Sequence, residues 1–207
     1  MGKNLDVNKP WNIDVYGNNI SIGENVHIRT SKNLITQLCS WNRNNCDGVI
    51  KIGDNVLISP GVRIISAKEI IIKSNVMIAS NVYISDSDWH GIYDRVNTPG
   101  LSQNIIIEEN SWIGEGSKIS KGVKIGKNSI IGLGSVVTSN VPDNEIFGGN
   151  PAKKIGEIDK NKKIRKREDL FLNNDYNKLM KFLIKEDLKE NNFFSWLRIL
   201  FFPKKGD

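Results

Sequence analysis

The sequence predicts an all-β fold, a parallel β-helix of six-residue repeats, followed by a C-terminal helical tail. An aliphatic residue recurs at every sixth position from Ile107 to Val137, five steps without a slip. Gly and Asn residues recur at one phase between these positions. The 207-residue chain contains 30 Ile and 26 Asn, and because Ile favours strands and Asn is poor inside helices, a mostly helical body is excluded.

The period of six defines each coil. A helix repeats at 3.6 residues and a strand at 2, so a period of six with Gly or Asn at one phase indicates a short strand, a turn and another short strand. Three such sides close one triangular coil. Stacking coils about 4.8 Å apart places the aliphatic residues in an inner column, and Asn and Gly supply left-handed corners at low cost. Shorter runs in the same register are Ile22 and Ile28, then Ile52, Ile58 and Ile64, then Ile72, Ile78 and Ile84.

Departures from the period predict two inserted loops. The step from Ile22 to Ile52 is 30 residues, which exceeds one 18-residue coil by 12 and predicts a loop near 30–49. The step from Ile72 to Ile107 is 35 residues, an excess of 17, which predicts a second loop near 85–104. Loops of this length in a solenoid project from one edge and are usually functional.

The repeat ends near residue 141, and we expect two domains. Residues 1–158 form the β-helix, with 16 Lys and Arg against 15 Asp and Glu. Residues 159–207 form a basic extension with 13 against 8, so the positive charge is terminal and argues against nucleic-acid binding. Within it, residues 160–190 predict an amphipathic helix and 193–205 a short aromatic segment ending in lysines. The extension either packs on the body or contacts an anionic membrane surface.

Three motifs give the chain a family resemblance over about residues 15–158. They are the repeat itself with Trp112-Ile113-Gly114, the run from Ile131 to Thr138, and Gly149-Asn150-Pro151-Ala152-Lys153. With these the chain resembles the hexapeptide-repeat acyltransferases of the left-handed β-helix type, and is most similar to the sugar O-acetyltransferases. The resemblance implies a left-handed winding, a homotrimer, acetyl-CoA as donor and an active site between adjacent subunits.

The sequence offers two histidines for catalysis. His27 precedes the core-facing Ile28, so we expect it to point outward without a catalytic role. His90 lies in the second inserted loop among carboxylates and aromatic residues, at the place of the family's catalytic histidine. Acetyl transfer needs a base to remove the proton of the acceptor hydroxyl, and imidazole suits this at neutral pH. Asp86 or Asp88 is expected to orient the ring, as the carboxylate does in a Ser-His-Asp arrangement.

The resemblance also suggests residues for donor and acceptor. Trp112 precedes an inward isoleucine, so it is expected to face outward, beside the histidine. The residues expected to contact the donor are Trp112, Gly114, Gly132, Ser135, Thr138, Lys153 and Lys154. Small residues allow the pantetheine arm to approach the backbone, and a lysine pairs with phosphate. Trp89, Tyr93 and Arg95 are expected on the acceptor side, because sugars stack on aromatic rings and arginine binds carboxylates.

These expectations converge on O-acetylation of a sugar hydroxyl in a cell-surface glycan, capsule or lipopolysaccharide, or in its precursor. Two alternatives stay open: N-acetylation of an amino sugar, and a non-catalytic β-helix that binds or supports a partner. A zinc carbonic anhydrase on this scaffold needs three histidines, so no metal is expected. The first residues carry no secretory signal, so we expect a cytoplasmic protein, with the inner face of the membrane as an alternative site.

Overall fold

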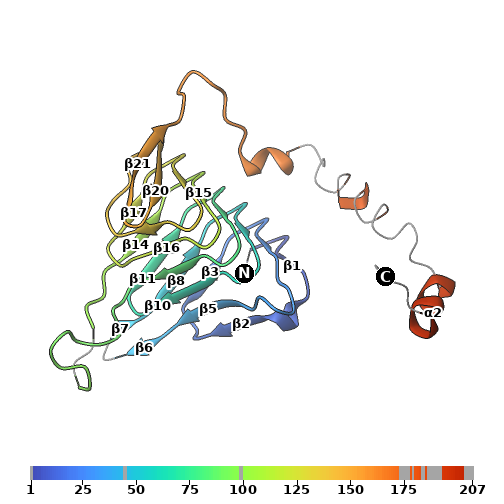
Figure 1. Cartoon of the computed structure of the whole chain (residues 1–207), viewed down its shortest axis with the longest axis horizontal. Coiled ribbons are helices and arrows are strands. Elements are labelled where there is room, and N and C mark those ends of the chain that lie inside the picture. Colours follow the sequence, from blue (N-terminus) through green and yellow to red (C-terminus); the bar gives the residue numbers. More distant parts are fainter. Residues whose placement is uncertain are drawn as a thin grey trace. The chain divides into compact units, whose positions relative to one another are not determined.

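The computed structural model describes residues 2–43, 46–97 and 100–172, together with 178, 180–182, 185 and 193–202. The chain divides into two compact units, residues 1–167 and 168–207, which are described separately. In the first unit the coils follow one another from the N-terminal strands to the C-terminal hairpin (Figure 1). The prediction of an all-β body with a parallel β-helix is confirmed, since the successive coils form three parallel sheets.

The three sheets are the sides of the triangular coil. Sheet 1 contains β1 (Asp6–Val7), β4 (His27–Ile28), β9 (Leu57–Ile58), β12 (Met77–Ile78), β15 (Trp112–Ile113), β18 (Ile130–Ile131), β20 (Glu145–Gly149) and β21 (Ala152–Glu157). Sheet 2 contains β2 (Ile13–Tyr16), β5 (Thr36–Ser40), β10 (Arg63–Ser66), β13 (Tyr83–Ser85), β16 (Lys118–Ile119) and β19 (Val136–Val137). Sheet 3 contains β3 (Ile20–Ile22), β8 (Val49–Ile52), β11 (Glu69–Ile72), β14 (Ile105–Ile107) and β17 (Lys124–Ile125). A 3₁₀ helix, η1 (Pro10–Asn12), joins β1 to β2, and β20 and β21 close the stack as an antiparallel hairpin.

The sixth-position aliphatics form the core. In sheet 1, Ile58, Ile78 and Ile113 stand in register in successive strands, and each is fully buried. Each buried isoleucine contributes about 1.5–3 kcal/mol relative to exposure, so the column supplies most of the stabilising burial.

Asparagine forms the corner between sheets 3 and 1. Asn25, Asn55 and Asn128 adopt positive φ angles of 54°, 57° and 59°. The amide of Asn25 donates to Asn55 Oδ1 at 3.1 Å, and that of Asn128 to Asn144 Oδ1 at 2.8 Å. Asn tolerates the left-handed conformation better than other residues with a Cβ, and here its side chain also bonds to the next coil.

Insertions leave the β-helix where sheet 2 turns into sheet 3, which we call the insertion corner. The first carries a hairpin of β6 (Asn42–Arg43) and β7 (Cys46–Asp47). The second spans residues 86–104 and projects beyond the strands as the green loop in Figure 1. Both therefore rise from the same edge of the β-helix, from two coils that are separated by the coil of β10 and β11.

Residues 159–167 form a basic strap on the first unit. They contain six Lys and Arg and one Asp, so the whole +5 excess of the C-terminal extension lies here, and residues 168–207 are neutral. The expected helix over 160–190 is wrong for 160–166, which are irregular. Instead Arg167 Nε donates to the Asn55 carbonyl at 2.7 Å, and Lys166 pairs with Glu109. Hydrogen bonds from Lys127 and then from Lys166 lower the pKa of Glu109.

The strap covers His27. This side chain was expected to point outward, and it does lie outside the aliphatic core, but it is 4% exposed because Arg167 Nη2 lies 3.2 Å from Nδ1. Burial, followed by the charges of Arg167 and Arg29, lowers the pKa of His27 to about 4. The ring is therefore neutral in the folded protein at pH 7.

We expect the stability of the β-helix to fall between pH 6.5 and 4 because of His27. The unfolded chain takes up a proton near pH 6.5, whereas the folded site takes none until about pH 4, so protons favour the unfolded state in this window. The loss amounts to about 2 kcal/mol at pH 5 relative to pH 7.5. Urea unfolding of wild type and His27→Gln at both pH values measures it. An equal pH dependence in the two proteins contradicts the prediction.

In the second unit, η2 (Arg167–Leu170) leads in from the strap, and α2 (Phe193–Phe201) forms the predicted aromatic segment as a helix. Residues 171–172 form a turn, so the expected α-helix is wrong for 167–172 as well, whereas 178, 180–182 and 185 are helical. The other residues up to 190 lie outside the described part of the chain. The rings of Phe193 and Trp196 on α2 lie 6.2 Å apart. No helix in the described part of the chain is long and apolar enough to cross a membrane.

Candidate active site

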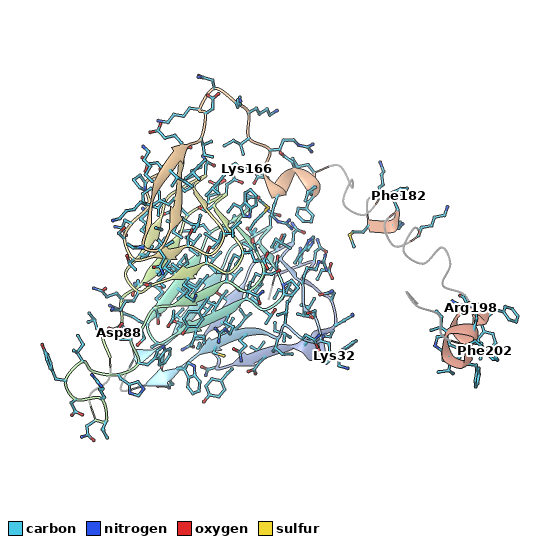
Figure 2. The ribbon with its side chains drawn as sticks, in the orientation of Figure 1. Lys32, Asp88, Lys166, Phe182, Arg198 and Phe202 are labelled. Atoms are coloured by element: carbon cyan, nitrogen blue, oxygen red, sulfur yellow. The ribbon has the colours of Figure 1, made fainter. Side chains whose placement is uncertain are left out.

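His90 stands at the base of the projecting loop with its ring held on one side. The loop follows β13, and Figure 2 shows its neighbour Asp88 where the loop leaves the stack. His90 Nδ1 lies 3.0 Å from the backbone carbonyl oxygen of Arg95. Because a carbonyl oxygen can only accept, Nδ1 carries the hydrogen, and Nε2 of the neutral ring is the unprotonated nitrogen. In this tautomer Nε2 is the nitrogen able to accept a proton.

Asp86 does not orient His90. Its carboxylate is fully buried and accepts hydrogen bonds from Ser66 Oγ at 2.7 Å, Ala67 N at 2.7 Å and Lys68 N at 2.9 Å. Two of the donors are main-chain N–H groups of the corner one coil below. Asp86 therefore fastens the start of the loop to the β-helix, a structural role in place of the expected catalytic one.

Asp88 is also engaged elsewhere. Its Oδ1 accepts a hydrogen bond from Lys121 Nζ at 2.7 Å, and its backbone N–H donates to the Leu101 carbonyl at 3.1 Å. His90 is thus bonded to the Arg95 carbonyl in place of a carboxylate, since the carboxylates of both aspartates hold the first end of the loop to the β-helix. The second end is also tied where Ser102 Oγ donates to Ser87 Oγ at 2.9 Å.

Trp89 is held in an unfavourable backbone conformation beside His90. Its φ is +66°, which costs energy for any residue with a Cβ and persists only where the surroundings impose it. The Trp89 backbone N–H donates to Ser87 Oγ, and its indole Nε1 donates to Ser85 Oγ, both at 3.1 Å. The loop is therefore folded back on itself at the residue before the histidine.

His90 lines a pocket of about 560 Å³ whose wall comes from both insertions. The lining residues are Trp41, Asn42, Ile65, Trp89 and His90. Trp89, which was predicted on the acceptor side, lines this pocket. Trp41 and Asn42 were not predicted as site residues. The break in the six-residue period did predict the first loop, near 30–49, in which both residues lie, and both loops leave the repeat after a sheet 2 strand.

Tyr93 and Arg95, which were expected on the acceptor side, are not among the residues that line the pocket. Tyr93 is fully exposed on the projecting loop. Arg95 contributes its backbone carbonyl to His90, so its function in the described site does not depend on its charge.

Two of the predicted donor residues are structural. Gly114 is buried, and a Cβ there would lie 2.5 Å from the Ile131 carbonyl oxygen, so the coils can stack only with glycine at this position. Ser135 is fully buried, with its Oγ donating to the Gly132 carbonyl at 2.6 Å and accepting from Gly149 N at 3.2 Å. Neither Gly114 nor Ser135 is exposed to a ligand.

The other donor candidates lie apart from the pocket. Trp112 is 47% exposed, as its outward position predicted, and Gly132 is partly exposed. Thr138 and Lys153 are exposed, whereas Lys154 is paired with Glu145 and Glu157, which raise its pKa. Gly132 follows a sheet 1 strand, so it lies at the corner between sheets 1 and 2, whereas His90 lies at the insertion corner. No cluster of three or more potential metal ligands occurs among the described residues.

Comparisons with known proteins agree with this architecture. Residues 104–139 match the family model of the bacterial transferase hexapeptide, described as six repeats. A maltose O-acetyltransferase from Clostridium difficile 630 is 29% identical, with a TM-score of 0.50 over 72% of this chain and 67% of that one. Over residues 104–139 the chain thus carries the six-residue repeat of the hexapeptide transferases, and it is similar to an acetyltransferase with this repeat. The resemblance seen in its motifs is confirmed.

Further solved structures share the fold of this chain. An N-acyltransferase from Bacillus cereus, in complex with dTDP and 3-hydroxybutyryl-CoA, has a TM-score of 0.64 at 21% identity over 87% of this chain and 90% of that one. A hexapeptide-repeat acetyltransferase from Vibrio cholerae has a TM-score of 0.52 at 22% identity over 77% and 73%. The fold class, a left-handed parallel β-helix, is thus confirmed. A search of the curated proteins found no match.

Proposed function

We propose that the protein transfers the acetyl group of acetyl-CoA to a sugar hydroxyl, with His90 as general base. The observation that supports this most is the Nδ1 contact with the Arg95 carbonyl, which leaves Nε2 basic at the edge of a pocket. Nε2 takes the hydroxyl proton as the sugar oxygen attacks the thioester carbonyl. The tetrahedral intermediate then expels the CoA thiolate, which receives that proton from the imidazolium.

The donor candidates support a homotrimer with a shared site. Trp112, Gly132, Thr138 and Lys153 are accessible, and the family resemblance assigns them to acetyl-CoA. Since Gly132 lies at a different corner from His90, one chain presents the base and a neighbouring chain the donor groove. Light scattering of the purified protein is expected to give about 70 kDa, three times the 23.3 kDa chain. A mass of one chain contradicts this arrangement.

The acceptor we propose belongs to a cell-surface glycan, capsule or lipopolysaccharide, or to its precursor. The maltose O-acetyltransferase among the similar structures supports a sugar hydroxyl. Acetyl-CoA is a cytoplasmic metabolite, so the reaction is proposed to occur in the cytoplasm, where nucleotide-linked or lipid-linked precursors are also found.

N-acetylation of an amino sugar is the second candidate. One structure of the Bacillus cereus N-acyltransferase contains dTDP-4-amino-4,6-dideoxyglucose, at 21% identity to this chain and a TM-score of 0.62. Release of the CoA thiol, measured across neutral and amino sugars, tests both reactions. Mild base removes an acetyl ester and leaves an acetyl amide, so a base-stable product overturns O-acetylation. Absence of thiol release with every acceptor favours a non-catalytic β-helix instead.

We also propose that α2 contacts a membrane surface. Trp196, Leu200 and Phe193 belong to one face of the helix and are more than half exposed, whereas Ser195 and Arg198 belong to the other. An amphipathic helix with aromatic residues inserts at the boundary between headgroups and acyl chains. The sequence continues with Lys204 and Lys205, which would add attraction to anionic lipid.

The full-length protein with Trp196→Ser and Leu200→Ser is expected to float with phosphatidylglycerol vesicles several-fold less than wild type. The two changes remove apolar area from the exposed face, while Ser195→Ala on the polar face serves as the matched control. Thiol release with a water-soluble acceptor is expected to stay unchanged. Equal flotation of the three proteins contradicts membrane contact.

A further inference from the structure

The wall of the His90 pocket continues into a row of aromatic rings that the proposed acetyl transfer does not explain. The centroids of Tyr16 and Trp41 lie 4.5 Å apart with an interplanar angle of 38°, and those of Trp41 and Trp89 lie 6.4 Å apart, edge to face. The three residues come from the ends of β2 and β5 and from the second insertion. Tyr16 is 51% and Trp41 41% exposed, so neither ring belongs to the buried core.

The backbone beneath this aromatic row is firmly held. Trp41 N donates to the Ser66 carbonyl at 2.8 Å, and Gly48 N donates to the Trp41 carbonyl at 2.9 Å, which closes the base of the hairpin. A Cβ on Gly48 would lie 2.3 Å from the Ser66 carbonyl oxygen, so the close approach needs glycine. The indole N–H of Trp89 is already bonded to Ser85. The backbone at Trp41 and the indole of Trp89 are therefore already held in place, so that a ligand contacting these rings would impose little further ordering.

The pocket carries little charge. Among the described lining residues, His90 is the one titratable group, and Asn42 supplies a neutral amide. The nearest aspartates of the loop are occupied, Asp86 by the corner backbone and Asp88 by Lys121. The described lining residues therefore offer no cation to the carboxylate of an acidic sugar, which would lose water around that carboxylate on binding.

We propose that Tyr16, Trp41 and Trp89 form an acceptor platform that stacks an uncharged pyranose ring and brings one of its hydroxyls to His90 Nε2. The apolar C–H face of a neutral sugar ring matches an aromatic face, and its hydroxyls match the amide of Asn42. This inference deepens the proposed function, on which it rests for the transfer step. It gives the acceptor a class, a neutral hexopyranose residue, and makes Trp41 the residue that selects it.

Binding without turnover tests the platform separately from the reaction. Saturation-transfer NMR on the full-length protein, using methyl glycosides of glucose, galactose, mannose and N-acetylglucosamine, is expected to detect binding of at least one. Methyl glucuronide is expected to bind at least tenfold more weakly. Trp41→Ala is expected to weaken the neutral glycoside by about 10- to 50-fold, and Trp41→Phe to retain most of the affinity because it keeps a ring. Trp11→Ala is the matched control, since Trp11 is 76% exposed on η1.

In the thiol-release assay, Trp41→Ala is expected to raise the acceptor KM by a similar factor, whereas Trp41→Phe and Trp11→Ala are expected to change it little. The acetyl-CoA KM is expected to stay unchanged in all three variants. Equal binding by wild type and Trp41→Ala, or tighter binding of the glucuronide, overturns the platform. Binding that depends on Trp41 supports it, and if such binding comes without thiol release from any acceptor, the proposed acetyl transfer is overturned while the sugar site stands.

Discussion

Replacing His90 with alanine is expected to lower kcat for acetyl transfer by about 10²–10⁴-fold, the usual contribution of a positioned general base. In the protein, the Arg95 carbonyl fixes the hydrogen on Nδ1, so Nε2 is ready to take the acceptor proton. Alanine removes this atom and leaves the pocket wall formed by Trp41, Asn42 and Ile65. The acceptor KM is therefore expected to change much less than kcat, because binding contacts survive.

The second histidine of the chain provides the control for this variant. His27 is covered by Arg167 outside the pocket, so His27→Gln assayed at pH 8, where His27 is neutral in the folded and unfolded chain, is expected to keep wild-type activity. His90 is exposed, and unfolding of His90→Ala should therefore match wild type. Transfer that survives His90→Ala contradicts a general base at this position and removes the central step of the proposed mechanism.

Periodic burial explains why the β-helix could be predicted from the sequence. Each coil repeats the same three sides, so every sixth residue meets the same environment, and Ile58, Ile78 and Ile113 record it directly. The corners are as regular, because positive φ angles select Asn or Gly. At each repeat the conformational preference of the residue agrees with its place in the packed coil, so the sequence pattern predicts the fold.

Contacts to the main chain explain why the details of the site could not be predicted. The orienting group of His90 is a backbone carbonyl, which every residue possesses and no sequence pattern marks. Asp86 looked like a catalytic carboxylate because it is close in sequence, but its partners belong to the previous coil. Trp41 and Trp89 lie far apart in the chain and meet in the pocket. Their meeting depends on how the two irregular insertions fold.

The position of the positive charge within the C-terminal extension could also not be inferred from its total. The sequence assigns +5 to residues 159–207, and the structure places that excess entirely in the strap, where Lys166 and Arg167 bond to the β-helix. A membrane contact of α2 would therefore depend mainly on its apolar face, with the two lysines near the C-terminus as the cationic contribution. The test of membrane contact therefore replaces the apolar residues Trp196 and Leu200 and leaves the charged residues unchanged.

Replacing Asp86 with alanine is expected to destabilise the protein by about 2–5 kcal/mol, because it leaves the buried Ser66 hydroxyl and the buried Ala67 N–H group without their carboxylate acceptor. Urea unfolding measures the loss. Asp88→Asn is the matched control: its ion pair with Lys121 is partly exposed, and such pairs contribute about 0–1 kcal/mol.

Activity separates the anchoring role of Asp86 from a direct role in catalysis. Asp86→Ala releases the start of the loop, so kcat is expected to fall together with stability, and added urea should widen the gap from wild type. A carboxylate that instead acted on His90 would lower kcat at unchanged stability. Full stability with lost activity would therefore return Asp86 to the reacting groups, whereas a stable and active Asp86→Ala protein would show that the loop is held by its other contacts, those of Ser87, Asp88 and Ser102.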